Sequence, residues 1–120
     1  MDISKAIAEL KNEPGFREKV GMILVHNGVV RATSRKDGRP VTGLELTPDQ
    51  AKIEVLRREF EQLPGIFRIL VEARSGSFQP GDDLLFIIVA GDLRENVKPV
   101  LAELLDRIKA EAVSKREILG

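Results

Sequence analysis

The side chains best able to do chemistry in this chain are basic, and several of them stand in its last quarter. A strand-like run ends at Gly91, and an amphipathic helix follows it, with Arg94 near the start of that helix and Lys109 near its end. The segment Lys115-Arg116-Glu117 comes soon afterwards. The chain has no cysteine and a single histidine, so a thiolate nucleophile is excluded. Lysine and arginine bind anions through charge-assisted hydrogen bonds, and this pattern therefore predicts chemistry on an anionic substrate.

Two further arginines stand at the ends of predicted strands. Arg31 closes one apolar run, and Arg74 follows another. Strand ends and a helix N-terminus can meet at one edge of a sheet, and the helix N-terminus itself favours anions. Each basic residue taken alone is more typical of a solvated surface, and Arg35, Lys36 and Arg39 in a charged turn are the least informative. An anion site is predicted only if several of these residues converge.

His26 is the only histidine, and its surroundings in the sequence predict a structural residue. A metal site there would need carboxylates for most of its ligands, and no acidic pair stands at ligand spacing nearby. The chain also carries neither a dinucleotide-binding fingerprint nor a phosphate-binding P-loop. We therefore expect no metal site and no cofactor.

Composition limits the classes of protein that fit. A length of 120 residues and a hydrophobic content of 42% predict one globular domain over residues 1–120. Nineteen basic residues balance nineteen acidic ones, so no overall field attracts nucleic acid or an acidic membrane. The polar start is unlike a signal peptide, and no apolar run is long enough to span a membrane. We expect a cytoplasmic protein.

The first third of the sequence predicts a helix and then a strand. Apolar residues recur at helical spacing from Ile3 to Leu10, and Pro14-Gly15 ends that helix. The β-branched run from Val20 to Arg31 predicts a strand. Within it, Asn27-Gly28 is either a turn or a bulge.

A turn, a strand and a second helix follow. The segment from Ser34 to Pro40 predicts the turn of a hairpin, whose returning strand runs from Val41 to Leu46. Thr47 is expected to cap the next helix, with Pro48 in its first position. Pro64-Gly65 ends that helix.

The second half repeats the pattern of two strands and a helix. Strands are predicted from Ile66 to Val71 and from Leu84 to Ala90, with a type II turn at Gln79 to Asp82 between them. In the last helix Pro99 lacks a backbone donor, so we expect Asn96 to cap the helix, with Pro99 in its first turn, or else a kinked helix. The order α-β-β-α-β-β-α predicts an α+β fold, a mostly antiparallel sheet with helices packed on it.

Read together from about Val20 to Glu117, several short motifs resemble the large, catalytic subunit of molybdopterin synthase. The matching motifs are Gly28-Val29-Val30-Arg31, Gly43-Leu44-Glu45, Ala73-Arg74-Ser75-Gly76, Pro80-Gly81-Asp82, Leu93-Arg94, Asp106-Arg107-Ile108-Lys109 and Ser114-Lys115-Arg116-Glu117. Ala73 and Leu93 stand where that family has histidines, and Ser114 stands where it has an aromatic residue. No single motif is specific, but their order and spacing together support the resemblance.

The resemblance implies an α/β-hammerhead-like fold and a role in molybdenum cofactor biosynthesis. The substrate would be cyclic pyranopterin monophosphate, and the sulfur would come from a small ubiquitin-like carrier protein with a C-terminal Gly-Gly thiocarboxylate. Lys109 and Lys115 would be the catalytic pair. Substrate binding would fall to Arg31, Arg94, Arg74 and Arg116, in part across the interface of a homodimer at the centre of a heterotetramer.

Two alternatives remain open from the sequence. A divergent, non-catalytic relative would bind a ubiquitin-like tail or a pterin without turnover. A small RNA-binding α+β domain would use the basic turn at residues 34–39, although balanced charge and few aromatic residues disfavour it.

Overall fold

The computed structural model describes residues 1–120 and contains two antiparallel sheets of three strands each. The first, called here the long sheet, has the order β1-β5-β3, with β1 at Met22–Val29, β5 at Asp83–Gly91 and β3 at Ile66–Ala73. The second, called the short sheet, has the order β4-β2-β6, with β4 at Gly76–Phe78, β2 at Val41–Pro48 and β6 at Val113–Leu119. Every strand pair is antiparallel, which confirms the predicted α+β class.

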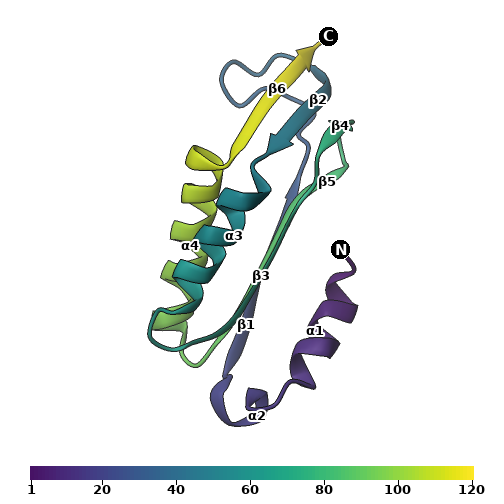
Figure 1. Ribbon diagram of the computed structural model, residues 1–120. Helices are drawn as coiled ribbons and strands as arrows, with labels where there is room; N and C mark the ends of the chain where they lie inside the picture. Colours follow the sequence, from purple (N-terminus) through teal and green to yellow (C-terminus); the bar gives the residue numbers. More distant parts are fainter.

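Four helices accompany the sheets (Figure 1), namely α1 at Ile3–Lys11, α2 at Phe16–Lys19, α3 at Gln50–Glu61 and α4 at Arg94–Glu111. The two longest, α3 and α4, lie side by side on one face of the long sheet, while α1 lies on the other side. None of the helices is both long and apolar enough to cross a membrane. The short sheet extends beyond the C-terminal end of α4, so the molecule is elongated, with extents of 50 × 26 × 25 Å.

The main core lies between the long sheet and the helix pair. Residues of β5 alternate, so that Leu85, Ile87 and Val89 face α3 and α4. The residues between them are also buried, on the face that carries α1. A central strand buried on both faces explains why the sequence of β5 is apolar at almost every position.

The chain crosses between the two sheets after β1, and here the predicted hairpin is wrong. The turn itself forms, since the Ser34 amide donates to the Arg39 carbonyl at 2.8 Å and Gly38 has φ +73°. The strands on either side do not pair with each other, because β1 pairs with β5 whereas β2 pairs with β4 and β6. Of the two alternatives for Asn27-Gly28, a turn or a bulge, the register shift between Gly28 and Val29 favours the bulge, and it lies where the chain leaves the long sheet.

Helix α3 begins later than the sequence predicts. Asp49, not Thr47, caps it, and the Asp49 carboxylate accepts a hydrogen bond from the Lys52 amide at 3.0 Å. Thr47 and Pro48 are instead the last residues of β2, because they pair with the start of β6. The prediction was wrong since it did not include β6 as a partner strand.

Helix α4 begins earlier than predicted, because its N-cap is Leu93 and not Asn96; it starts at Arg94, so Pro99 lies inside it. Asp92 makes the earlier start possible, because its Oδ1 accepts from the Leu93 amide at 2.6 Å and from the Asn96 side chain at 2.9 Å. These hydrogen bonds lower the pKa of Asp92, that of Asn96 being the larger cause. Pro99 is exposed, so water can bind the carbonyl that lacks its usual partner.

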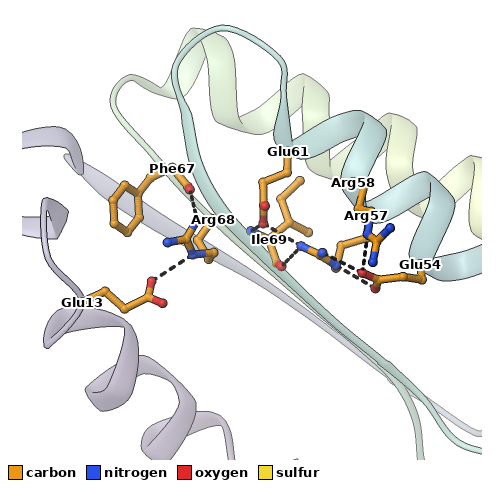
Figure 2. A network of polar contacts seen from close by, with 8 residues as sticks. All are labelled: Glu13, Glu54, Arg57, Arg58, Glu61, Phe67, Arg68 and Ile69. Atoms are coloured by element: carbon orange, nitrogen blue, oxygen red, sulfur yellow. Dashed lines mark hydrogen bonds and ion pairs between the residues drawn. The ribbon is translucent and has the colours of Figure 1, made fainter.

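An ion-pair network, called here the α3–β3 network, attaches α3 to the edge strand β3 (Figure 2). Arg57 contacts Glu54 and Glu61, each at 2.7 Å, and the Glu61 carboxylate accepts from the Ile69 amide at 2.9 Å. Arg58 adds a second contact to Glu54 at 3.0 Å. The arginines, and foremost the hydrogen bond from Arg57, lower the pKa of Glu54 to about 2. Each arginine drawn in this region has a carboxylate partner.

Candidate functional site

A cavity of about 310 Å³ lies where the long sheet, the short sheet and the end of α4 meet. Both sheets contribute to its wall, with Leu84 and Leu85 from β5 and Leu44 and Leu46 from β2. Its charged residues come from several elements, and they are Arg31, Arg35, Lys109, Lys115 and Glu117. Four basic side chains and one acidic side chain give the wall a net charge of +3, which favours an anionic ligand.

The long sheet contributes His26 and Gly28 from β1 and Ala73 from β3. Gly28 and Ala73 both lie opposite Leu85 of β5, one on each side, so they stand at the same level of the sheet. A Cβ at Gly28 would lie 3.0 Å from His26 Nε2. The absent side chain of Gly28 is therefore what leaves room for the imidazole ring.

Arg31 and Arg35 come from the segment that crosses between the sheets. The amide of Val30 donates to the Asp82 carbonyl at 2.9 Å, and the Gly81 amide donates to the Val30 carbonyl at 2.9 Å. These two bonds hold the chain immediately before Arg31 against the turn that precedes β5. The position of Arg31 thus depends on the Pro80-Gly81 turn as well as on β1.

The end of α4 and the strand β6 supply the two lysines. Lys109 lies in the last turn of α4, and β6 begins two residues after that helix ends. The Asp49 amide donates to the Ala112 carbonyl at 2.7 Å, which fixes the junction against the end of β2. Side chains alternate along β6, so Lys115 and Glu117 reach the cavity while Arg116 points to the opposite face.

The basic residues of the cavity lack partners within the chain. Arg31, Arg35, Lys109 and Lys115 form no ion pair with a carboxylate and no hydrogen bond through their side chains. Glu117 is held by Ser34, whose Oγ donates to Glu117 Oε1 at 3.3 Å. The cavity therefore holds positive charge that a ligand would neutralise.

His26 differs from the other polar residues of the wall. Its Nε2 is buried and has no hydrogen-bond partner. Burial, and secondarily the nearby Lys109 ammonium, hold the pKa of His26 below its usual value of 6.5. The ring is therefore neutral at physiological pH.

Three of the six predicted site residues come together in the cavity, and three do not. Arg31, Lys109 and Lys115 line it. Arg116 lies on the other face of β6, where it forms two hydrogen bonds with Glu45 at 2.9 and 3.1 Å. This pairing lowers the pKa of Glu45, the hydrogen bond being the larger cause.

Arg74 and Arg94 also lie outside the cavity of their own chain. The guanidinium of Arg74 stacks 5.1 Å from the centre of the Phe78 ring and donates to the Asp83 carbonyl at 3.1 Å. Arg94 is 79% exposed and pairs only with its neighbour Glu95, at 3.2 Å. It starts α4, whereas Lys109 stands near the end, about 22 Å away along the helix axis.

His26, Arg35 and Glu117 also line the cavity, although the sequence does not predict them as site residues. Alternation along a strand could have identified Glu117 from Lys115, had β6 been recognised. Arg35 belongs to a charged turn, and only the crossing between the sheets brings that turn to the cavity.

The structure contains no group of three or more histidine, aspartate or glutamate side chains that could hold a metal ion. The arrangement can bind an anion, with two lysines able to donate or accept protons beside it.

Comparisons with protein families, curated proteins and solved structures all point to proteins of molybdopterin synthesis. A family model described as MoaE protein matches residues 1–111. A probable molybdopterin synthase of Haloferax volcanii is 28% identical over 102 residues, which are 81% of this chain and 39% of that protein. The chain thus spans less than half the length of that curated relative.

Solved structures share the fold. Molybdopterin synthase from Staphylococcus aureus superimposes with a TM-score of 0.72 at 23% identity, covering 84% of this chain and 76% of that one. Molybdopterin cofactor biosynthesis protein E from Burkholderia multivorans gives 0.75 at 22% identity, covering 99% and 84%. A complex of subunits 1 and 2 of molybdopterin-converting factor from Helicobacter pylori gives 0.73 at 17% identity, covering 99% and 80%.

Proposed function

We propose, because the chain belongs to the MoaE protein family, that it is the large subunit of a molybdopterin synthase. In this role it transfers sulfur from a thiocarboxylated small carrier protein to cyclic pyranopterin monophosphate, as one domain over residues 1–120. The observation that carries the proposal is the group of four unpaired basic residues around one cavity. A phosphorylated substrate and a partner that ends in a carboxylate are both anions, and such a wall suits both.

The residues of the cavity divide between binding and chemistry in this proposal. Arg31 and Arg35 hold the substrate phosphate, because guanidinium groups match phosphate oxygens in pairs. Lys109 and Lys115 come from two different elements, α4 and β6, and assist the addition of sulfur and the departure of oxygen. The sulfur arrives on the partner, so the absence of cysteine from the chain is compatible with the reaction.

The assembly we propose is a homodimer at the centre of a heterotetramer, in the cytoplasm. The carrier is a small ubiquitin-like protein whose C-terminal Gly-Gly tail enters the cavity. Arg94 lies far from the cavity of its own chain, so a contribution to substrate binding requires that it reach the cavity of a second copy. Arg74 and Arg116 have partners elsewhere, and their positions do not support a direct role.

Reconstitution tests the proposal. The chain, a thiocarboxylated carrier and cyclic pyranopterin monophosphate should form the dithiolene product, and Lys109→Ala should reduce the rate by about 100-fold or more. Lys98→Ala is the matched control, because Lys98 is an exposed lysine of the same helix that does not line the cavity. Equal rates for Lys109→Ala and the wild type would remove the catalytic assignment.

A non-catalytic relative is distinguished by the same components. It would bind the carrier or the pterin in calorimetry and yield no product at any concentration of the chain. That result would reject the proposed synthase activity while leaving the cavity as a binding site.

A further inference from the structure

The proposed function gives His26 no role. His26 Nε2 is enclosed and unpartnered, although a buried polar atom without a hydrogen bond costs stability. An apolar ring at this position would avoid that cost. The imidazole is thus a feature that packing alone does not explain.

The register of β1 directs this ring to the cavity. Met22 and Leu24 are on the face of β1 that packs against the main core, and His26 is the next residue on that face. Leu24 meets the core under the helix pair, whereas His26 stands at the end of the core, where the cavity opens. The ring extends along the strand toward Gly28. At this level the long sheet contributes only Gly28, Ala73 and Leu85 to the cavity wall, and none of these has a polar side chain.

The charged groups that line the cavity together with His26 come from three parts of the chain. They are Lys109 from α4, Lys115 and Glu117 from β6, and Arg31 and Arg35 from the crossing segment. The neighbouring strands β3 and β5 contribute only apolar side chains, Ala73, Leu84 and Leu85. An imidazolium would thus add a fifth positive charge to four that have no partner.

We propose that His26 is the proton-accepting residue of this cavity, neutral when the cavity is empty and protonated when an anionic ligand binds. Binding forms one N–H bond on the ring, and one O–H bond of a hydronium ion in the solvent breaks, which leaves a water molecule. The negative charge of the anion offsets the unpaired cations of the cavity and so raises the pKa of His26. The imidazolium that forms has two N–H groups, and both can donate hydrogen bonds. Burial, and secondarily the Lys109 ammonium, hold the pKa of the free residue low, so the ring is neutral before the anion binds.

Nuclear magnetic resonance can follow this directly, because His26 is the only histidine of the chain. The untagged protein is titrated with acid in sodium sulfate and in sodium chloride at equal ionic strength. Sulfate stays a dianion across this range and serves as the probe. We expect the pKa of His26 to lie below 6.5 in chloride and about half a unit or more higher in sulfate. Equal midpoints in the two salts would overturn the inference.

Two variants separate this role from a structural one. His26→Gln keeps a polar side chain that does not titrate, so sulfate binding should no longer take up a proton, as measured by calorimetry in two buffers of different ionisation enthalpy. His26→Phe removes the unpartnered nitrogen, so it should weaken sulfate binding at pH 6 by about threefold or more without lowering the melting temperature. Proton uptake by His26→Gln equal to that of the wild type would contradict the proposal, as would wild-type affinity in His26→Phe.

The inference deepens the proposed function and rests on its anionic ligand, but its test does not require turnover. A sulfate-dependent pKa in a chain that makes no dithiolene product would reject the synthase proposal alone. A fixed pKa in an active enzyme would reject the role of His26 alone.

Discussion

The α3–β3 network and the cavity contain the same types of side chain in opposite electrostatic states. In the network, Arg57 has a carboxylate on either side at 2.7 Å. In the cavity, Arg31 and its three basic neighbours have no carboxylate partner, although Glu117 is in the same wall. The network satisfies its charges within the chain, whereas the cavity leaves them for a ligand.

The difference indicates which charges are structural. Paired charges on α3 fix the helix to β3, and their net contribution is small because water also solvates them. Unpaired charges of one sign repel one another and lower stability, so their retention requires another reason. A basic residue of this chain is therefore better judged by its partners than by its position in the sequence.

The largest expected effect comes from removing cations of the cavity. The double variant Arg31→Ala/Lys115→Ala loses two charge-assisted contacts to the ligand and should weaken sulfate binding by about 100-fold. The melting temperature should stay the same or rise, because repulsion decreases. The control is Arg58→Ala, an exposed arginine of the network that should leave binding unchanged. Calorimetry measures the sulfate affinity, and thermal unfolding measures the melting temperature. A large fall in the melting temperature of the double variant would contradict the conclusion that the cavity cations are not structural.

A smaller effect is expected from the network. Arg57→Ala leaves Glu61 as a half-buried carboxylate without its cation, so we expect a loss of about 1–2 kcal/mol in the free energy of unfolding. Ligand binding should not change, since the network does not line the cavity. Urea unfolding monitored by circular dichroism measures the loss. If Arg58→Ala lowered the free energy of unfolding by the same amount, burial of the Arg57–Glu61 pair would not explain the loss.

The smallest effect is the response of the network to acid. Glu54 has a pKa of about 2 in the folded chain and an ordinary value of 4.5, so its contribution is complete above pH 4.5 and is lost as the pH falls toward 2. Glu54→Gln should therefore reduce the difference in urea midpoint between pH 5 and pH 3 by a small, measurable amount. An unchanged difference would mean that Glu54 contributes nothing to acid sensitivity.

Periodicity predicts the main helices and strands of the fold because their apolar residues must face one core. Helix α1, the helix α3 and strand β5 all follow from such patterns. Strand β6 was missed because its central residues are Lys115, Arg116 and Glu117, which a pattern of burial does not reveal. The mistaken cap at Thr47 followed from this omission, since β6 is what extends β2 to Pro48.

Part of the site was also predictable, for a different reason. Arg31, Lys109 and Lys115 were chosen from their place in motifs, and the structure brings them to one cavity. His26 and Arg35 could not be chosen in this way, because the cavity that they line forms only where the chain bulges after Gly28 and then crosses between the sheets. Both features are set by pairings between distant segments, which one sequence does not reveal.

The position of the cavity between the two sheets has a mechanical consequence. No strand of the long sheet pairs with a strand of the short sheet, so no backbone ladder transmits force between them. A ligand that contacts Lys109 at the end of α4 and Lys115 in β6 would link the part of the molecule that carries the long sheet to the short sheet. Occupancy should then slow amide hydrogen exchange in β2 and β6, at positions that the ligand never touches.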